Sequence, residues 1–189
     1  MPLSTPVPRE HFHTRTYEFR GYRRADKLWD IEGRIVDAKT YDFENEERGH
    51  VRAGVPVHEM QIRITIDNRL MVHAIEATTE HSPFRVCGGI VPNYQAMVGV
   101  RVGPGWRQAI KAKLGGAAGC THMSELLMAM ATPCYQTVFP ILERERRAKT
   151  GETDDTLWPG LLNTCHAYAE DSPLVEKWLP EQYRGKKSS

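Results

Sequence analysis

The sequence predicts an α+β fold, with an antiparallel sheet of about four strands in the N-terminal half packed against a C-terminal helical layer. Two patterns predict this class. Residues 57–66 alternate strictly between apolar and polar side chains, which is the period of a half-buried strand. After Ser82-Pro83 the pattern becomes helical, and residues 121–130 are apolar nearly all round, as in a central buried helix. Strands followed by helices are typical of an α+β domain.

Two earlier segments, residues 14–19 and 28–41, are expected to be the first strands. In the second segment, four odd-numbered residues would lie on the same side of a half-buried strand: Trp29, Ile31, Ile35 and Asp37. Residues 42–53 are polar, charged and contain glycine, so they predict a mobile loop.

Asp67-Asn68 predicts a two-residue hairpin turn, followed by a return strand over 69–77. The register that such a turn sets places His58 and His73 on the same apolar face. We therefore expect His73 to belong mostly to the core.

Glycine and proline divide the C-terminal half into four expected helical segments: residues 92–98, 104–114, 121–149 and 174–178. Gly115-Gly116 ends the second segment. Pro133 and Pro140 predict a kink or a break in the third, because proline removes a helical hydrogen bond. Cys134, beside Pro133, is expected in the core.

A single domain is expected over 14–183, between a flexible leader at 1–13 and a flexible tail at 184–189. A net charge of +1 gives no field that would attract nucleic acid or a membrane. No apolar run approaches the roughly 18 residues of a membrane span, and the leader lacks the apolar core of a signal peptide. These features predict a cytoplasmic protein with a small-molecule substrate and with no nucleic-acid or membrane partner, and they are compatible with a homo-oligomer.

The four cysteines form no CxxC pair, so in a reducing compartment they are expected as free thiols or as metal ligands. Residues 119–122 read Gly-Cys-Thr-His at a glycine-rich helix start. There the helix dipole favours the thiolate of Cys120, and His122 can turn its ring toward the same spot. The pair is either a nucleophile and its base, a part of a metal site, or a buried cysteine beside a satisfied histidine.

His58 lies at the mouth of its strand next to Glu59, where functional side chains are often mounted, although a satisfied core histidine is the alternative. The candidate tetrahedral zinc ligands are His58, Cys87, Cys120 and His122, with iron as the alternative metal. An open position at the metal would supply an activated water, with Glu59 as the general base. Whether Cys165-His166 joins this site stays open.

The basic cluster of Arg20, Arg23 and Arg24 lies between the first two expected strands. It is either a solvated turn or an anion clamp, because guanidinium groups bind carboxylates in a bidentate manner. Arg23 and Arg24 are the candidates for holding a substrate carboxylate.

Several motifs, taken together, carry a family resemblance: Pro56-Val57-His58-Glu59-Met60 before the hairpin, Ser82-Pro83-Phe84 with Cys87, and Gly119-Cys120-Thr121-His122-Met123. They resemble the uncharacterised bacterial domain-of-unknown-function family 2889 over roughly residues 15–183. In that family the positions of His58, Cys87, Cys120, His122 and Cys165 look like signature residues, whereas Met123 replaces the usual leucine. The resemblance implies catabolism of small aromatic or acyl compounds and no settled reaction.

The order of antiparallel strands, a loop cysteine and a second cysteine at a helix start is also similar to the iron–sulfur scaffold proteins of the NifU type. Their motifs are absent here, so this likeness concerns only the fold and the place of a metal site.

These observations lead to three hypotheses. The first is a zinc-dependent cytoplasmic enzyme of the lyase or hydrolase type that acts on a small aromatic or acyl substrate. The second is a non-catalytic scaffold that binds metal or sulfur. In the third, the thiols are core residues and the protein acts through a partner surface.

Overall fold

The structure is a computed structural model that describes residues 2–151 and 159–185. The chain divides into two compact units, Met1–Glu143 and Arg144–Ser189. Residues 2–12 form neither helix nor strand. The predicted tail lies mostly outside the described residues, and the single domain over 14–183 stays a prediction.

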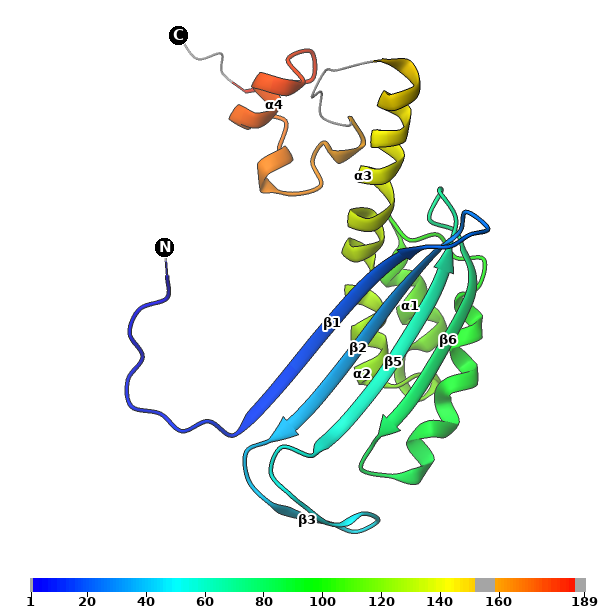
Figure 1. Cartoon of the computed structure of the whole chain (residues 1–189). Helices are drawn as coiled ribbons and strands as arrows, with labels where there is room; N and C mark the ends of the chain where they lie inside the picture. The colour runs from blue at the N-terminus through cyan, green and yellow to red at the C-terminus, as the bar shows by residue number, and fades with distance from the viewer. Residues whose placement is uncertain (1, 152–158, 186–189) are drawn as a thin grey trace. The chain divides into compact units, whose positions relative to one another are not determined.

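The first unit contains a four-stranded antiparallel sheet in the order β1-β2-β5-β6 (Figure 1). Its strands are β1 (His13–Arg23), β2 (Trp29–Lys39), β5 (Pro56–Ile66) and β6 (Val72–His81). The parity predicted for β2 is confirmed, because Trp29, Ile31, Ile35 and Asp37 are all buried. The α+β fold with a four-stranded sheet in the N-terminal half is therefore confirmed.

Helices follow the sheet in the chain. The sheet is followed by a long 3-10 segment, η1 (Arg85–Met97), and then by α1 (Trp106–Leu114), η2 (Gly116–Ala118), α2 (Thr121–Ala129) and α3 (Ala131–Thr150). The second unit contains η3 (Pro159–Leu161), η4 (His166–Tyr168) and α4 (Pro173–Trp178). The predicted break is found at Met130, so that Pro133 occupies the first turn of α3, where its missing N–H costs little. Pro140 lies inside α3. Among the described helices, none has both the length and the apolar character that a membrane span requires.

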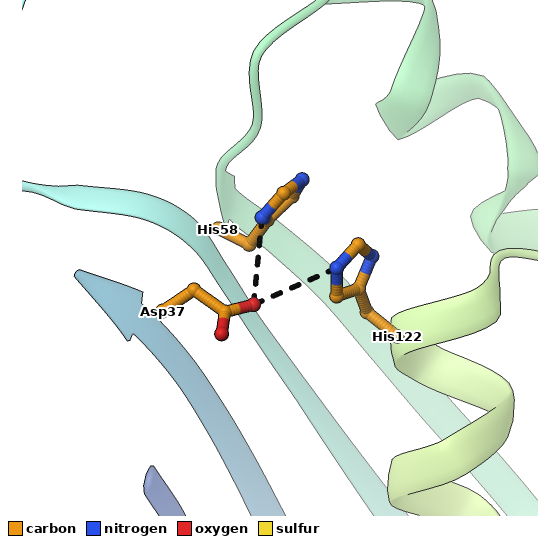
Figure 2. A group of neighbouring side chains, drawn as sticks. All are labelled: Asp37, His58 and His122. Atoms are coloured by element: carbon orange, nitrogen blue, oxygen red, sulfur yellow. Dashed lines mark ion pairs between the residues drawn. The ribbon is translucent and has the colours of Figure 1, made fainter. Parts of the chain in front are cut away.

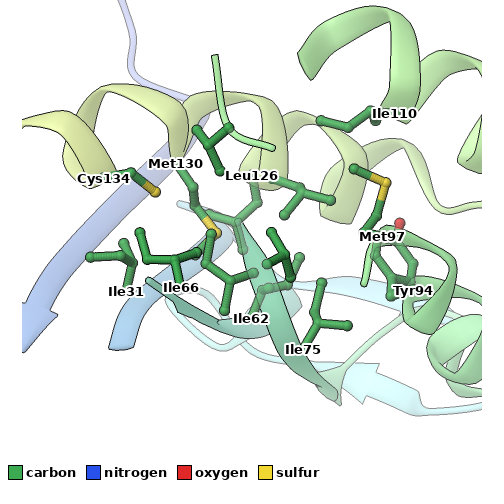
Figure 3. Packing of buried hydrophobic residues seen from close by; sticks show 14 of the residues in the cluster. Ile31, Ile62, Ile66, Ile75, Tyr94, Met97, Ile110, Leu126, Met130 and Cys134 are labelled. Carbon is green, nitrogen blue, oxygen red and sulfur yellow. The ribbon is translucent and has the colours of Figure 1, made fainter. Parts of the chain in front are cut away.

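The core lies between one face of the sheet and the helices of the first unit (Figures 1 and 3). Figure 3 shows isoleucines of the strands facing Leu126 and Met130 of the helical layer. Gly33 of β2 permits this close approach, since a Cβ there would lie 3.1 Å from Leu126 and 3.2 Å from Met130. Buried Trp106 donates its indole N–H to the carbonyl of Leu127 at 3.1 Å and so fixes α1 against α2.

The β5–β6 connection is longer than the predicted two-residue turn. Residues 67–71 lie between the strands, and Leu70 is fully buried in the left-handed conformation, with φ of 63°. A register shift at Ile66 then places Val72, rather than His73, in the core. The prediction that His73 belongs to the core is therefore wrong, because a bulge reverses the parity of a strand.

The predicted loop over 42–53 contains a small two-stranded sheet, formed by β3 (Phe43–Asn45) and β4 (Gly49–Val51). The Asn45 side chain accepts hydrogen bonds from the amides of Glu47 and Arg48 at 3.1 and 3.0 Å, which builds the turn. The polar composition predicted a loop here because two such short strands carry little periodic signal.

Candidate metal centre

One row of side chains crosses three strands at one end of the sheet. Arg15 of β1 pairs with Asp37 of β2, which pairs in turn with His58 of β5. A register shift follows immediately between Asp37 and Ala38, and such bulges often re-aim side chains beside functional sites. His122, from the first turn of α2, meets this row from the helical layer (Figure 2).

The turn before α2 determines where His122 lies. Gly119 packs on the preceding helix, and a Cβ there would lie 2.1 Å from the carbonyl oxygen of Leu114. The buried Tyr94 hydroxyl donates to the carbonyl of Cys120 and accepts from its amide, both at 3.2 Å. These contacts anchor the backbone two residues before His122.

Replacing Gly119 by alanine is therefore expected to lower the free energy of unfolding by about 1–3 kcal/mol, because the new methyl group overlaps a backbone carbonyl. Gly88→Ala is the matched control, since a Cβ at Gly88 meets nothing within 4 Å. Urea denaturation of both variants measures the difference, and equal stability would show that this turn tolerates a side chain.

Three ligand atoms converge on one point. The carboxylate oxygen Oδ2 of Asp37 lies 3.4 Å from His58 Nδ1 and 3.5 Å from His122 Nε2. The donor atoms of the three residues all lie within 4.8 Å of one another. Ligands about 2.05 Å from a tetrahedral zinc ion are separated by roughly 3.3 Å. The two oxygen–nitrogen distances therefore match two edges of a zinc tetrahedron.

Asp37 is held as a buried carboxylate, with a side chain that is 3% exposed. Its Oδ1 accepts from His13 Nε2 and from Arg15 Nε, both at 2.8 Å, and its Oδ2 accepts from Arg15 Nη2 at 2.9 Å. Burial alone would raise the pKa of Asp37, but the hydrogen bonds from Arg15 and His13 outweigh it and hold that pKa below its usual range. A carboxylate oxygen has two lone pairs, so Oδ2 can still face the histidines.

The two histidines are held in their neutral, metal-binding form. Burial and, to a smaller extent, the neighbouring His122 together lower the pKa of His58 to about 4. Burial also lowers the pKa of His122, with Arg15 adding to the effect. The rings stack with centroids 3.9 Å apart and an angle of 27° between planes, an arrangement that disfavours charge on both.

The stability of the metal-free protein is expected to fall as the pH drops from about 6.5 toward 4. In this range the unfolded His58 binds a proton and the folded His58, with its pKa of about 4, does not, so protonation favours unfolding. The loss amounts to at most about 3 kcal/mol. Urea denaturation across this pH range measures it, and His58→Gln should flatten the curve. An unchanged slope in that variant would contradict the assignment.

Cys120 lies beside the three donor atoms, on the other edge of the His122 ring. Its Sγ is 3.9 Å from His122 Nδ1, whereas Asp37 faces Nε2. A histidine that binds metal through one nitrogen commonly has its other nitrogen held by a hydrogen-bond partner. Cys120 is thus placed to orient His122 rather than to complete the group of three.

The other predicted site residues of the sheet and of η1 lie elsewhere. Glu59 follows His58 in the strand and so faces the opposite side of the sheet, where its carboxylate binds Arg34 at 2.6 Å and His81 at 3.1 Å. It is therefore not placed to act as the base at this site. Among the described residues, Cys87 does not join the group of metal-binding atoms. Cys165 is exposed in the second unit, and its role stays open.

The predicted anion clamp lies at the far end of β1. Arg23 pairs with Trp29, eight residues along the strand from Arg15, which corresponds to roughly 26 Å. The Arg23 guanidinium lies 5.0 Å from the centre of the Trp29 ring. Arg24 binds Asp26 at 2.9 Å. A small substrate at Asp37 would not reach either arginine.

Sequence reasoning missed Asp37, Arg15 and His13 as site residues. Asp37 carried a signal, because it is a carboxylate on the buried parity of its strand, and a buried charge requires partners. Arg15 and His13 carried none, since their place depends on the β1–β2 register. Glu125 of α2 extends the network by accepting from Arg15 Nη1 at 2.8 Å.

Comparison with known proteins gives one family. The family model described as "Protein of unknown function (DUF2889)" matches residues 13–136. No curated protein and no solved structure matches the chain, so the likeness to NifU-type scaffolds has no support.

Proposed function

The chain belongs to the DUF2889 family, and we propose that it is a metal-dependent enzyme that holds zinc between Asp37, His58 and His122. The observation that carries this proposal is the convergence of one carboxylate oxygen and two imidazole nitrogens at 3.4 and 3.5 Å. Two histidines and a carboxylate are a known ligand set of catalytic zinc sites, and iron(II) uses the same set.

Three protein ligands leave a coordination position open, and this is what distinguishes catalytic from structural zinc sites. A metal there would supply Lewis acidity and an activated water for a lyase or hydrolase reaction. Arg15 keeps Asp37 ionised and oriented through its two hydrogen bonds. His13 donates to Asp37 Oδ1 through Nε2, and its side chain is 51% exposed, so its other ring nitrogen, Nδ1, replaces Glu59 as the candidate proton acceptor.

We propose small aromatic and acyl compounds as the first substrates to test. We also propose that the protein is cytoplasmic. Hydrolytic or lytic cleavage of such compounds develops charge on an oxygen, which a metal cation stabilises.

A second candidate function rests on the line formed by Cys120, His122 and Asp37. His122 lies between the thiol, 3.9 Å from Nδ1, and the carboxylate, 3.5 Å from Nε2. This order of nucleophile, base and orienting acid is that of a cysteine hydrolase. It would need no metal.

Metal analysis of the chain purified without a histidine tag separates these functions. Its zinc content is expected to be near one ion per chain, and hydrolysis of aryl esters and acyl thioesters is expected to disappear after chelation and return with zinc. Bound zinc without any catalytic turnover would indicate a non-catalytic metal-binding scaffold. Turnover that survives chelation and disappears in Cys120→Ser would instead establish the thiol nucleophile.

A further inference from the structure

We propose that Arg48 binds the carboxylate of an anionic substrate beside the metal, which makes aromatic or acyl compounds that carry a carboxylate group the substrate class of this site. The inference rests on the proposed function, because it concerns the same site. Arg48 lies in the turn between β3 and β4. It takes over the role of anion clamp that the sequence predicted for Arg23 and Arg24.

The Arg48 side chain reaches the backbone that leads into His58. Its Nη1 donates to the carbonyls of Pro56 and Val57 at 2.9 and 3.3 Å, and the Val57 carbonyl belongs to the peptide bond with His58. The register shift between β2 and β5 leaves Val57 without a partner residue on β2. Arg48 therefore binds the bulge that directly precedes one of the proposed metal ligands.

The β3–β4 hairpin that carries Arg48 is itself held in place. Figure 1 shows this hairpin at the end of the sheet where β5 begins. The Asn45 side chain accepts from the amide of Arg48 at 3.0 Å, and the Glu47 carboxylate accepts from the amide of Arg85, the first residue of η1, at 2.6 Å. The guanidinium thus extends from an anchored turn, which lowers the entropy that a bound ligand must cost.

The guanidinium of Arg48 can still bind a carboxylate. Within the described residues it forms no ion pair, and its Nε and Nη2 have no hydrogen-bond partner. Arg15, by contrast, already uses Nε and Nη2 on Asp37 and Nη1 on Glu125. The two nitrogens that are open in Arg48 are thus the same pair with which Arg15 holds a carboxylate in a bidentate manner.

The charge of Arg48 also acts on the metal-binding group. Burial is the main cause of the lowered pKa of His58, and the guanidinium of Arg48 is one of the charges that add to it. A Coulomb interaction fades with distance and with screening by salt, so this effect places the guanidinium near the His58 ring. A small compound can therefore meet the metal with one end and Arg48 with its carboxylate.

Calorimetric titration of the full chain with benzoate tests the proposal, both with and without added zinc. The wild type is expected to bind benzoate. Arg48→Gln removes the charge and keeps an N–H donor, and it should weaken this binding about tenfold or more, as the loss of one charge-assisted hydrogen bond does. Arg48→Lys keeps the charge and should weaken it less. Both variants should retain the zinc content of the wild type.

Arg52→Gln is the matched control, because it removes the same charge from an exposed arginine just after β4. It should leave the benzoate affinity unchanged. The proposal is overturned by a wild type that does not bind benzoate, by an Arg48→Gln variant that binds it equally well, or by equal losses in Arg48→Gln and in either of the other two variants. Failure of the proposed function looks different: zinc or turnover is absent, while benzoate binding still depends on Arg48.

Discussion

Asp37→Ala is expected to lower the free energy of unfolding by about 3 kcal/mol at neutral pH. The substitution removes the carboxylate that accepts two hydrogen bonds from Arg15 and one from His13. It leaves the Arg15 guanidinium, whose side chain is 32% exposed, without its main counterion. Removing one partner of a largely buried pair costs more than the pair itself contributes. Chemical denaturation of the metal-free protein measures the loss.

Glu125→Gln is the control for this prediction. Glu125 is the second carboxylate bound by Arg15, but its side chain is 44% exposed, so its loss should cost less than about 1 kcal/mol. If both variants lose the same small amount, Asp37 does not organise this end of the sheet.

His58→Ala and His122→Ala are each expected to weaken zinc binding more than 100-fold. Each removes one of the three converging donor atoms, and even residues that merely orient a ligand change metal affinity by 10–100-fold. Competition with a chromophoric chelator measures the affinity. Cys120→Ser should have the smaller effect of an orienting residue, because its Sγ contacts the far nitrogen of His122.

His81→Ala is the matched control for the two histidine variants. His81 lies in the same sheet but binds Glu59 on the opposite face. Its loss should leave the zinc affinity unchanged. An equal loss in all three variants would indicate non-specific binding by exposed histidines and would contradict the site.

The fold could be predicted where the signal is local. The strand over residues 57–66 and the shared parity of Trp29 and Ile31 are properties of single strands, and both are confirmed, although Thr65 is buried together with Ile64 and Ile66. His73 was placed wrongly because its position depends on a bulge and on buried Leu70, which the sequence does not mark. Register between strands is set by such details rather than by composition.

The candidate site could be predicted only in part, for the same reason. His58 and His122 were found because a histidine on an apolar strand face and one at a glycine-rich helix start are unusual. Glu59 could have been set aside from the sequence, since alternation turns it away from His58. Asp37 enters the site through pairing with both neighbouring strands, which no local pattern shows.

The position of Asp37 also changes the interpretation of the Gly-Cys-Thr-His segment. Sequence reasoning placed both Cys120 and His122 among the metal ligands. In the structure the His122 ring lies between Cys120 and Asp37, so the carboxylate takes the place expected for sulfur. The proposed ligand set is accordingly made of oxygen and nitrogen.

X-ray absorption at the zinc edge tests this ligand set most directly. In the zinc-loaded protein, a shell of nitrogen and oxygen atoms is expected at about 2.0–2.1 Å, with imidazole scattering and no sulfur at about 2.3 Å. Asp37→Asn and His122→Ala should each reduce that shell. A sulfur neighbour, or a chain that retains no zinc, would contradict the proposed centre of Asp37, His58 and His122.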